Sequence, residues 1–146
     1  MPLLRAALSW NFVLATAICA SLLAQLIKVL LNLFIFHRFI AERMWGAGGM
    51  PSSHSATVCA MVVATGRYCG VNSPIFAIAA VLSIIVMYDA MGVRYETGEQ
   101  AKVLNRMFTE WMDQGFEQFQ LPHGKKLKEM VGHTPIEVVT GAALGI

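Results

Sequence analysis

Two histidines stand at the starts of expected helices, in surroundings that suit phosphate chemistry. One ends the segment Gly48-Gly49-Met50-Pro51-Ser52-Ser53-His54, and the other opens the segment His133-Thr134-Pro135-Ile136-Glu137. Ser52 or Ser53 is the expected N-cap of the first helix, and Thr134 that of the second. The glycines allow close backbone approach, and first-turn amides attract an anion such as phosphate. One histidine can then attack phosphorus while the other protonates the leaving oxygen.

A lysine stands on the polar stripe of an otherwise apolar segment, Phe12–Phe36. The polar residues of this segment recur at helical spacing: Ser21, Gln25, Lys28 and Asn32. They share one face of a helix, and in a membrane such a face turns towards neighbouring helices or a wet cavity. The alternative is that Lys28 reaches out to the lipid headgroups.

Two of the chemically interesting residues also have a purely structural interpretation. Glu137 has the spacing of a capping box with Thr134, besides being a carboxylate able to orient His133. The segment ending in His54 is also a turn and helix cap, in which the imidazole would bond to a carbonyl.

Asp89 is the first acidic residue after a long, nearly uncharged stretch. We expect it to pair with Arg94 or a neighbouring cation, and catalysis is the alternative. A metal site of His54, His133, Asp89 and Glu137 would lack the H-x-x-x-H or paired-cysteine spacing of metal ligands. No metal and no cofactor are therefore expected.

The composition places these residues in a membrane. Of the 146 residues, 56% are hydrophobic and only 14% are charged, against about a quarter charged in soluble domains. A disordered chain is therefore excluded, and the net charge of +2 is too small to imply nucleic acid as a partner. Three cysteines, odd in number and in or beside apolar runs, exclude a disulfide framework.

The apolar runs predict an all-α membrane bundle in a single domain, residues 1–146. We expect three to four short transmembrane helices, at about 11–36, 53–67, 74–92 and 134–146. The polar connection 93–133 is expected to hold an amphipathic surface helix that starts at a Thr97-Gly98-Glu99-Gln100 capping box. The last apolar run is short, so either it leans on partners or the sequence is truncated.

The basic residues predict the orientation of this bundle. If three helices precede Asp89, one side holds only Arg5 and Arg67. The other side holds Arg38, Arg43, Arg94, Lys102, Arg106, Lys125, Lys126 and Lys128. The richer side is then cytoplasmic, or stromal in an organelle, and both polar loops share it.

Three blocks of the chain resemble a known group of proteins. They are Gly49–Ala56 (GMPSSHSA), Asp89–Arg94 (DAMGVR) and Leu127–Glu137 (LKEMVGHTPIE). Together they are similar to the divergent membrane branch of the type 2 phosphatidic acid phosphatase and vanadium haloperoxidase superfamily. The resemblance runs from about Gln25 to Ile146, and it is specific only as a combination of blocks.

The resemblance implies phosphomonoester hydrolysis through a phosphohistidine, without a metal. The superfamily's Pro-Ser-Gly-His block is similar to Pro51–His54, which implies that His54 is the general acid. The last block implies that His133 attacks phosphorus and that Glu137, in place of an aspartate, orients it. The first-block lysine that binds phosphate resembles Lys28.

The sequence departs from the superfamily pattern at the residues that hold phosphate. Ser53 replaces a glycine, no Arg-Pro pair follows Lys28, and the Ser-Arg pair before the last histidine is absent. Arg38 and Arg43 are candidates for the first of these missing arginines. The other expected phosphate ligands are Arg94, Lys128 and the amides around Ser52 and Ser53, and of these only an arginine grips phosphate bidentately.

Two classes of function follow from these observations. The first is a phosphatase-like membrane protein that acts on a lipid or isoprenoid phosphate at the cytoplasmic face of the bilayer. The second is a non-catalytic subunit or assembly factor, in a homo-oligomer or a larger membrane complex, whose site has degenerated. A phosphate carrier is a weaker alternative, because four short helices make a poor alternating-access machine.

Overall fold

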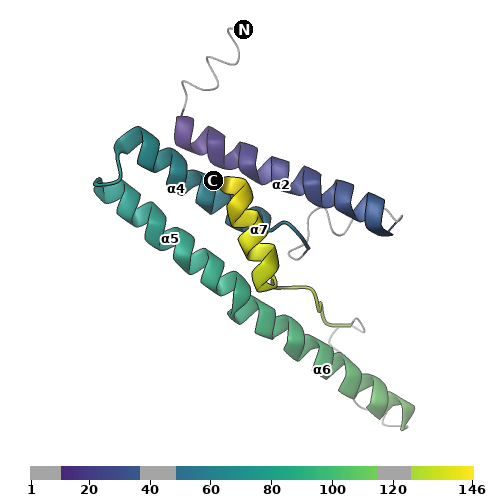
Figure 1. Ribbon diagram of the computed structural model, residues 1–146. Helices are drawn as coiled ribbons and strands as arrows, with labels where there is room; N and C mark the ends of the chain where they lie inside the picture. The colour runs from purple at the N-terminus through teal and green to yellow at the C-terminus, as the bar shows by residue number, and fades with distance from the viewer. Residues whose placement is uncertain (1–10, 37–48, 115–125) are drawn as a thin grey trace.

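The computed structural model describes residues 11–36, 49–114 and 126–146, and within these ranges it is all-helical. The helices are α2 (Phe12–Phe36), α4 (Ser53–Cys69), α5 (Pro74–Met91), α6 (Val93–Asp113) and α7 (Pro135–Gly145). Helix α4 lies at the centre, packed against α2, α5 and α7 (Figure 1). The all-α class predicted from the sequence is therefore confirmed.

Two stretches of the described chain are long and apolar enough to cross a membrane. They are Phe12–Phe34 in α2 and Pro74–Asp113, which joins α5 to α6. Both helices α2 and α5 carry large apolar side chains on their outer surfaces, such as Leu22 and Ile78. Exposing such an apolar surface to water is unfavourable, whereas the hydrocarbon chains of lipids solvate it. The number of crossings and the sidedness stay predictions, and Arg5, Arg38, Arg43 and Lys125 lie outside the described residues.

Small residues let α7 lie directly on the backbone of α4. On α4 the buried residues Ala56, Ala60 and Ala64 recur every fourth position. On α7 a Cβ atom at Gly141 would overlap the carbonyl oxygen of Ser52, and one at Gly145 would overlap that of Ala56. Helices in membranes associate closely through such small-residue faces. The short α7 is thereby fixed against the start of α4, where the first histidine lies.

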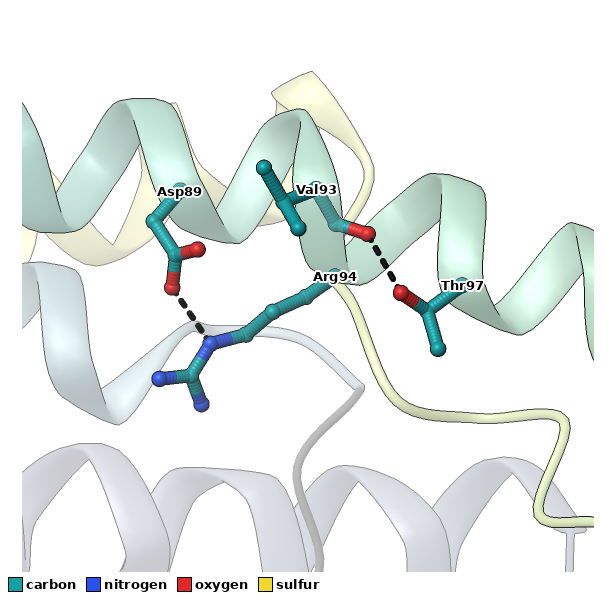
Figure 2. A network of polar contacts seen from close by, with 4 residues as sticks. All are labelled: Asp89, Val93, Arg94 and Thr97. Carbon is teal, nitrogen blue, oxygen red and sulfur yellow. Dashed lines mark hydrogen bonds and ion pairs between the residues drawn. The ribbon is translucent and has the colours of Figure 1, made fainter.

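The long helical run from α5 to α6 is interrupted only at Gly92, whose amide donates to the Tyr88 carbonyl at 2.8 Å. The capping box predicted at Thr97 is wrong, because α6 already begins at Val93. The Thr97 hydroxyl instead donates to the Val93 carbonyl at 2.7 Å (Figure 2). A threonine inside a helix bonds back to the preceding turn in this way and caps nothing. Helix α6 then extends past the end of the other helices (Figure 1).

The segment before α7 is attached to the side of α6. Buried Asn105 donates to the Leu127 carbonyl and to Glu129 Oε1, both at 2.9 Å, and accepts the Leu127 amide at 2.8 Å. A Cβ atom at Gly98 of α6 would overlap the Glu129 carbonyl. One at Gly132 would overlap the backbone of α6 at its start. This segment therefore runs in direct backbone contact with α6 up to His133.

Replacing Asn105 with alanine is expected to destabilise the protein by about 1–3 kcal/mol, because the Leu127 amide and carbonyl lose a buried partner. Thermal unfolding of the protein in detergent measures this change. Thr109→Ala on the same helix is the control, since the Thr109 hydroxyl bonds only within its helix, to the Asn105 carbonyl. Equal midpoints for the two variants would show that Asn105 does not hold the segment.

Candidate active site

The fold brings the two histidines together from segments about 80 residues apart in the sequence. His54 lies in the first turn of α4, and His133 lies just before the N-cap of α7. Their ring centroids are 6.1 Å apart and their planes meet at 79°. His133 is only 2% exposed, whereas His54 is exposed. The pair thus combines one buried imidazole with one that solvent can reach.

His133 is held by its backbone while part of its ring is left without a partner. Its amide donates to the Ala90 carbonyl at 3.0 Å, in the last turn of α5, where carbonyls lie beyond the reach of the helix's own donors. Its Nε2 atom is buried and has no hydrogen-bond partner in the described structure. A buried polar atom left in this state costs about 1–3 kcal/mol. Nε2 is therefore the atom that an incoming ligand or water would satisfy.

A cavity of about 150 Å³ is lined in part by His133. Its lining, which we call the histidine cavity, consists of His54, Ile85, Val86, Asp89, Ala90, Arg94 and His133. At roughly 30 Å³ per water molecule, the space suits a group of about five non-hydrogen atoms, the size of a phosphate. A larger groove of about 700 Å³ lies near the opposite end of α4 and is lined mainly by apolar residues, with no charged side chain or histidine.

Lys28 is buried beside the histidines, with only 1% of its surface exposed. The alternative in which it reaches the headgroups is therefore wrong. Gly49 lies over its methylene stem, since a Cβ atom there would be 3.7 Å from Lys28 Cδ, and Gly49 has a φ of +84° that favours glycine. The Lys28 ammonium interacts electrostatically with Glu137 and with both histidines. Arg94 also acts on both histidines, so two cations flank the pair.

The surroundings keep His133 neutral at physiological pH. Burial above all, and then the positive charges of Lys28, His54 and Arg94, lower the pKa of His133 from 6.5 to about 4. A neutral imidazole has a lone pair available for attack, whereas an imidazolium does not.

This lowered pKa predicts a pH-dependent loss of stability. The unfolded chain takes up a proton at His133 near pH 6.5 and the folded chain only near pH 4, so stability should fall as the pH drops between these values. We expect His133→Gln to have a weaker dependence of its thermal midpoint on pH in this window. Identical profiles for the two proteins would contradict the lowered pKa.

Glu137 connects the starts of α4 and α7. Its Oε2 accepts the Thr134 amide at 3.0 Å, which is the capping-box interpretation, and its carbonyl accepts the Ser52 amide at 3.0 Å. The Ser52 hydroxyl in turn accepts the Ser55 amide at 3.3 Å and caps α4. The expectation that the Ser52 amide binds phosphate is thereby corrected, because α7 packs close enough to occupy it. The first-turn amides of Ser53 and His54 stay the predicted anion-binding donors of α4.

The remaining predicted site residues are divided between the cavity and the surface. Asp89 and Arg94 line the histidine cavity and form an ion pair (Figure 2). Lys128 is exposed and does not line the cavity, so the structure does not bring it to the histidines. Arg38 and Arg43 lie outside the described residues. Within the described ranges, no group of three His, Cys, Asp or Glu side chains is placed to hold a metal ion.

Several residues on which the site depends could not be predicted from the sequence. The Ala90 carbonyl anchors His133, and Asn105 holds the preceding segment, but neither residue type nor spacing marks them. Ile85 and Val86 line the cavity from within an ordinary apolar run. The spacing of Gly141 and Gly145 is a small-xxx-small pattern, and such a pattern in a sequence is a signal for close helix packing.

These features define a helical membrane protein with a histidine pair flanked by cationic side chains. The chain belongs to the Divergent PAP2 family, which it matches over residues 9–146. It is 38% identical over 142 residues to the uncharacterized membrane protein YuiD of Bacillus subtilis (strain 168), covering 93% of this chain and 90% of that protein. No solved structure matches. The phosphatidic acid phosphatase side of the resemblance is confirmed at the level of the family, and the haloperoxidase side stays a prediction.

Proposed function

We propose that this protein is a phosphatase-like membrane enzyme that hydrolyses a lipid or isoprenoid phosphomonoester through a phosphohistidine. The observation that carries the proposal is the pairing of His133 with His54 around a phosphate-sized cavity, with the Nε2 atom of His133 buried and without a hydrogen-bond partner in the described structure. Membership of a divergent branch of phosphatidic acid phosphatases supports the same reaction class.

In the proposed mechanism, the neutral imidazole of His133 attacks phosphorus. The bond from phosphorus to the ester oxygen breaks, and His54 donates a proton to that oxygen, so that the alcohol leaves. Water then attacks the phosphohistidine, His54 takes a proton from it, and inorganic phosphate departs. Lys28 and Arg94 stabilise the charge on the phosphoryl oxygens throughout. Glu137 accepts the Thr134 amide and thereby holds the backbone next to His133.

The walls of the cavity support a lipid rather than a soluble ester. Ile85 lines the histidine cavity and is also exposed on α5, one of the two helices able to cross a membrane. A phosphate bound at the histidines would place its alcohol beside this apolar wall, where an acyl or isoprenoid chain continues into the bilayer. We propose that the histidines lie on the cytoplasmic side of a multi-pass protein, as the basic residues predict.

Phosphate release by the purified protein in detergent tests this proposal. We expect release from lipid phosphates and much slower release from water-soluble phosphomonoesters, because only the former use the apolar wall. No release from either, together with stoichiometric partner subunits in native mass spectrometry, would contradict the enzyme and support the non-catalytic subunit.

A further inference from the structure

The wall of the histidine cavity contains an ion pair, Arg94 with Asp89, and the mechanism above gives a role to Arg94 but none to Asp89. Arg94 Nε and Asp89 Oδ2 are 2.5 Å apart, on either side of Gly92, where α5 gives way to α6. Both side chains are partly exposed, 50% for Arg94 and 38% for Asp89. An ion pair this exposed contributes little to stability, so a structural role alone accounts poorly for its place beside the histidines.

The geometry of the pair leaves the phosphate-binding edge of the guanidinium available. Asp89 contacts Arg94 through Nε, and the two terminal nitrogens point away from the carboxylate (Figure 2). A guanidinium has five N–H donors in a planar fork, and Nε carries only one of them. The terminal nitrogens carry the other four, which can grip phosphate bidentately.

The same turn of α5 also holds His133. The Ala90 carbonyl, one residue after Asp89, accepts the His133 amide at 3.0 Å. His133 and both members of the ion pair line one cavity, and the Nε2 atom of His133 is buried without a hydrogen-bond partner in the described structure. Asp89 and Ala90 together therefore fix an arginine through its side chain and a histidine through its backbone. This juxtaposition suits an anion held between the two.

We propose that Asp89 is a positioning residue, which holds Arg94 by Nε so that its terminal nitrogens bind the phosphate attacked by His133. Arg94 then replaces the arginines that the sequence lacks after Lys28 and before His133. The inference rests on the phosphate-binding part of the proposed function. It differs from a simple electrostatic role, in which a carboxylate beside a phosphate site repels the anion or competes with it for Arg94.

The direction in which Asp89→Asn changes the affinity for orthovanadate separates these two roles. Orthovanadate binding to the purified protein in detergent, followed by ⁵¹V NMR, reports the site without requiring turnover. Asp89→Asn removes a negative charge, so repulsion or competition predicts tighter binding. Positioning predicts binding about tenfold weaker, since the asparagine amide oxygen accepts from Arg94 Nε much more weakly than the carboxylate does. Glu110→Gln is the matched control and should bind vanadate as the wild type does. It removes the carboxylate of the exposed Arg106–Glu110 pair on α6, the helix that also carries Arg94.

Three further variants show whether Asp89 acts through Arg94. Arg94→Ala should weaken vanadate binding at least as much as Asp89→Asn, and the double variant should bind no more weakly than Arg94→Ala alone. Arg94→Lys keeps the charge and removes the fork, so a similar loss supports the geometry even where Asp89→Asn fails to fold. Additive losses in the double variant would overturn the inference, as would unchanged or tighter binding by Asp89→Asn.

Failure of the inference is distinguishable from failure of the proposed function. Vanadate binding that weakens in Asp89→Asn, without hydrolysis of any phosphomonoester, would overturn the enzyme and uphold the positioning role. Hydrolysis that Asp89→Asn leaves unchanged in both KM and kcat would uphold the enzyme and overturn the positioning role. A wild-type protein that binds no vanadate would overturn the positioning role as well.

Discussion

Alanine in place of His133 should reduce phosphate release from a lipid phosphate by at least about a thousandfold, because the reaction loses its nucleophile. Vanadate binding should weaken as well, since the proposed site holds the anion against the His133 imidazole, whose Nε2 atom has no other partner in the described structure. The same variant should fail to retain ³²P from a labelled substrate in an acid-labile, base-stable form, which is the behaviour of phosphohistidine. The measurements are phosphate release and label retention by protein purified in detergent.

The other histidines provide the controls for this experiment. His123→Ala, outside the three sequence blocks, should leave both measurements unchanged. His54→Ala should slow hydrolysis of an alkyl phosphate far more than that of a p-nitrophenyl phosphate, because a good leaving group needs no general acid. A His133→Ala protein that is folded and retains the wild-type rate would show that the nucleophile is another residue.

Leucine in place of Gly141 should destabilise the protein by at least about 3 kcal/mol, because its side chain would have to occupy the space of the Ser52 carbonyl. Helix α7 would be pushed from α4, and the Glu137–Ser52 backbone bond that joins the two helix starts would break. We therefore expect lower thermal midpoints and loss of vanadate binding in the same variant.

The matched control for Gly141→Leu lies on the same helix. Ala143 is exposed on α7, so Ala143→Leu adds the same side chain where nothing opposes it. Its thermal midpoint should stay close to that of the wild type. Equal destabilisation by the two leucines would mean that α7 does not pack on α4 through its glycines.

Hydropathy was sufficient to find α2, α4, α5 and α7, because each of these helices occupies an apolar run of the chain. Helix α2 occupies the run Phe12–Phe36, and α5 begins at Pro74, where the proline suits a first helical position. The start of α6 could not be found in this way. The threonine at position 97 has the residue type of a cap, but the chain upstream was already helical.

The polar stripe of α2 could not by itself decide where Lys28 lies. An inward lysine and one that reaches the headgroups share the same spacing, and the choice depends on whether another segment covers the side chain. Gly49, in its left-handed conformation, provides that cover. Glu137 was ambiguous for a similar reason, since capping α7 with Thr134 and orienting His133 fit the same spacing. In the structure its carboxylate accepts the Thr134 amide, as the capping interpretation predicts.

By itself the sequence determined the membrane class, the all-α architecture and the two helix starts that carry the histidines, because these depend on local apolar pattern and capping chemistry. Only the tertiary structure decided that the histidines lie 6.1 Å apart, that Lys28 is buried beside them and that Lys128 is not. Those outcomes depend on how closely α7 approaches α4 and on where the backbone of residues 126–133 meets α6. Both are set by glycines and backbone bonds between distant segments, and no local pattern specifies which partner such a glycine or carbonyl will meet.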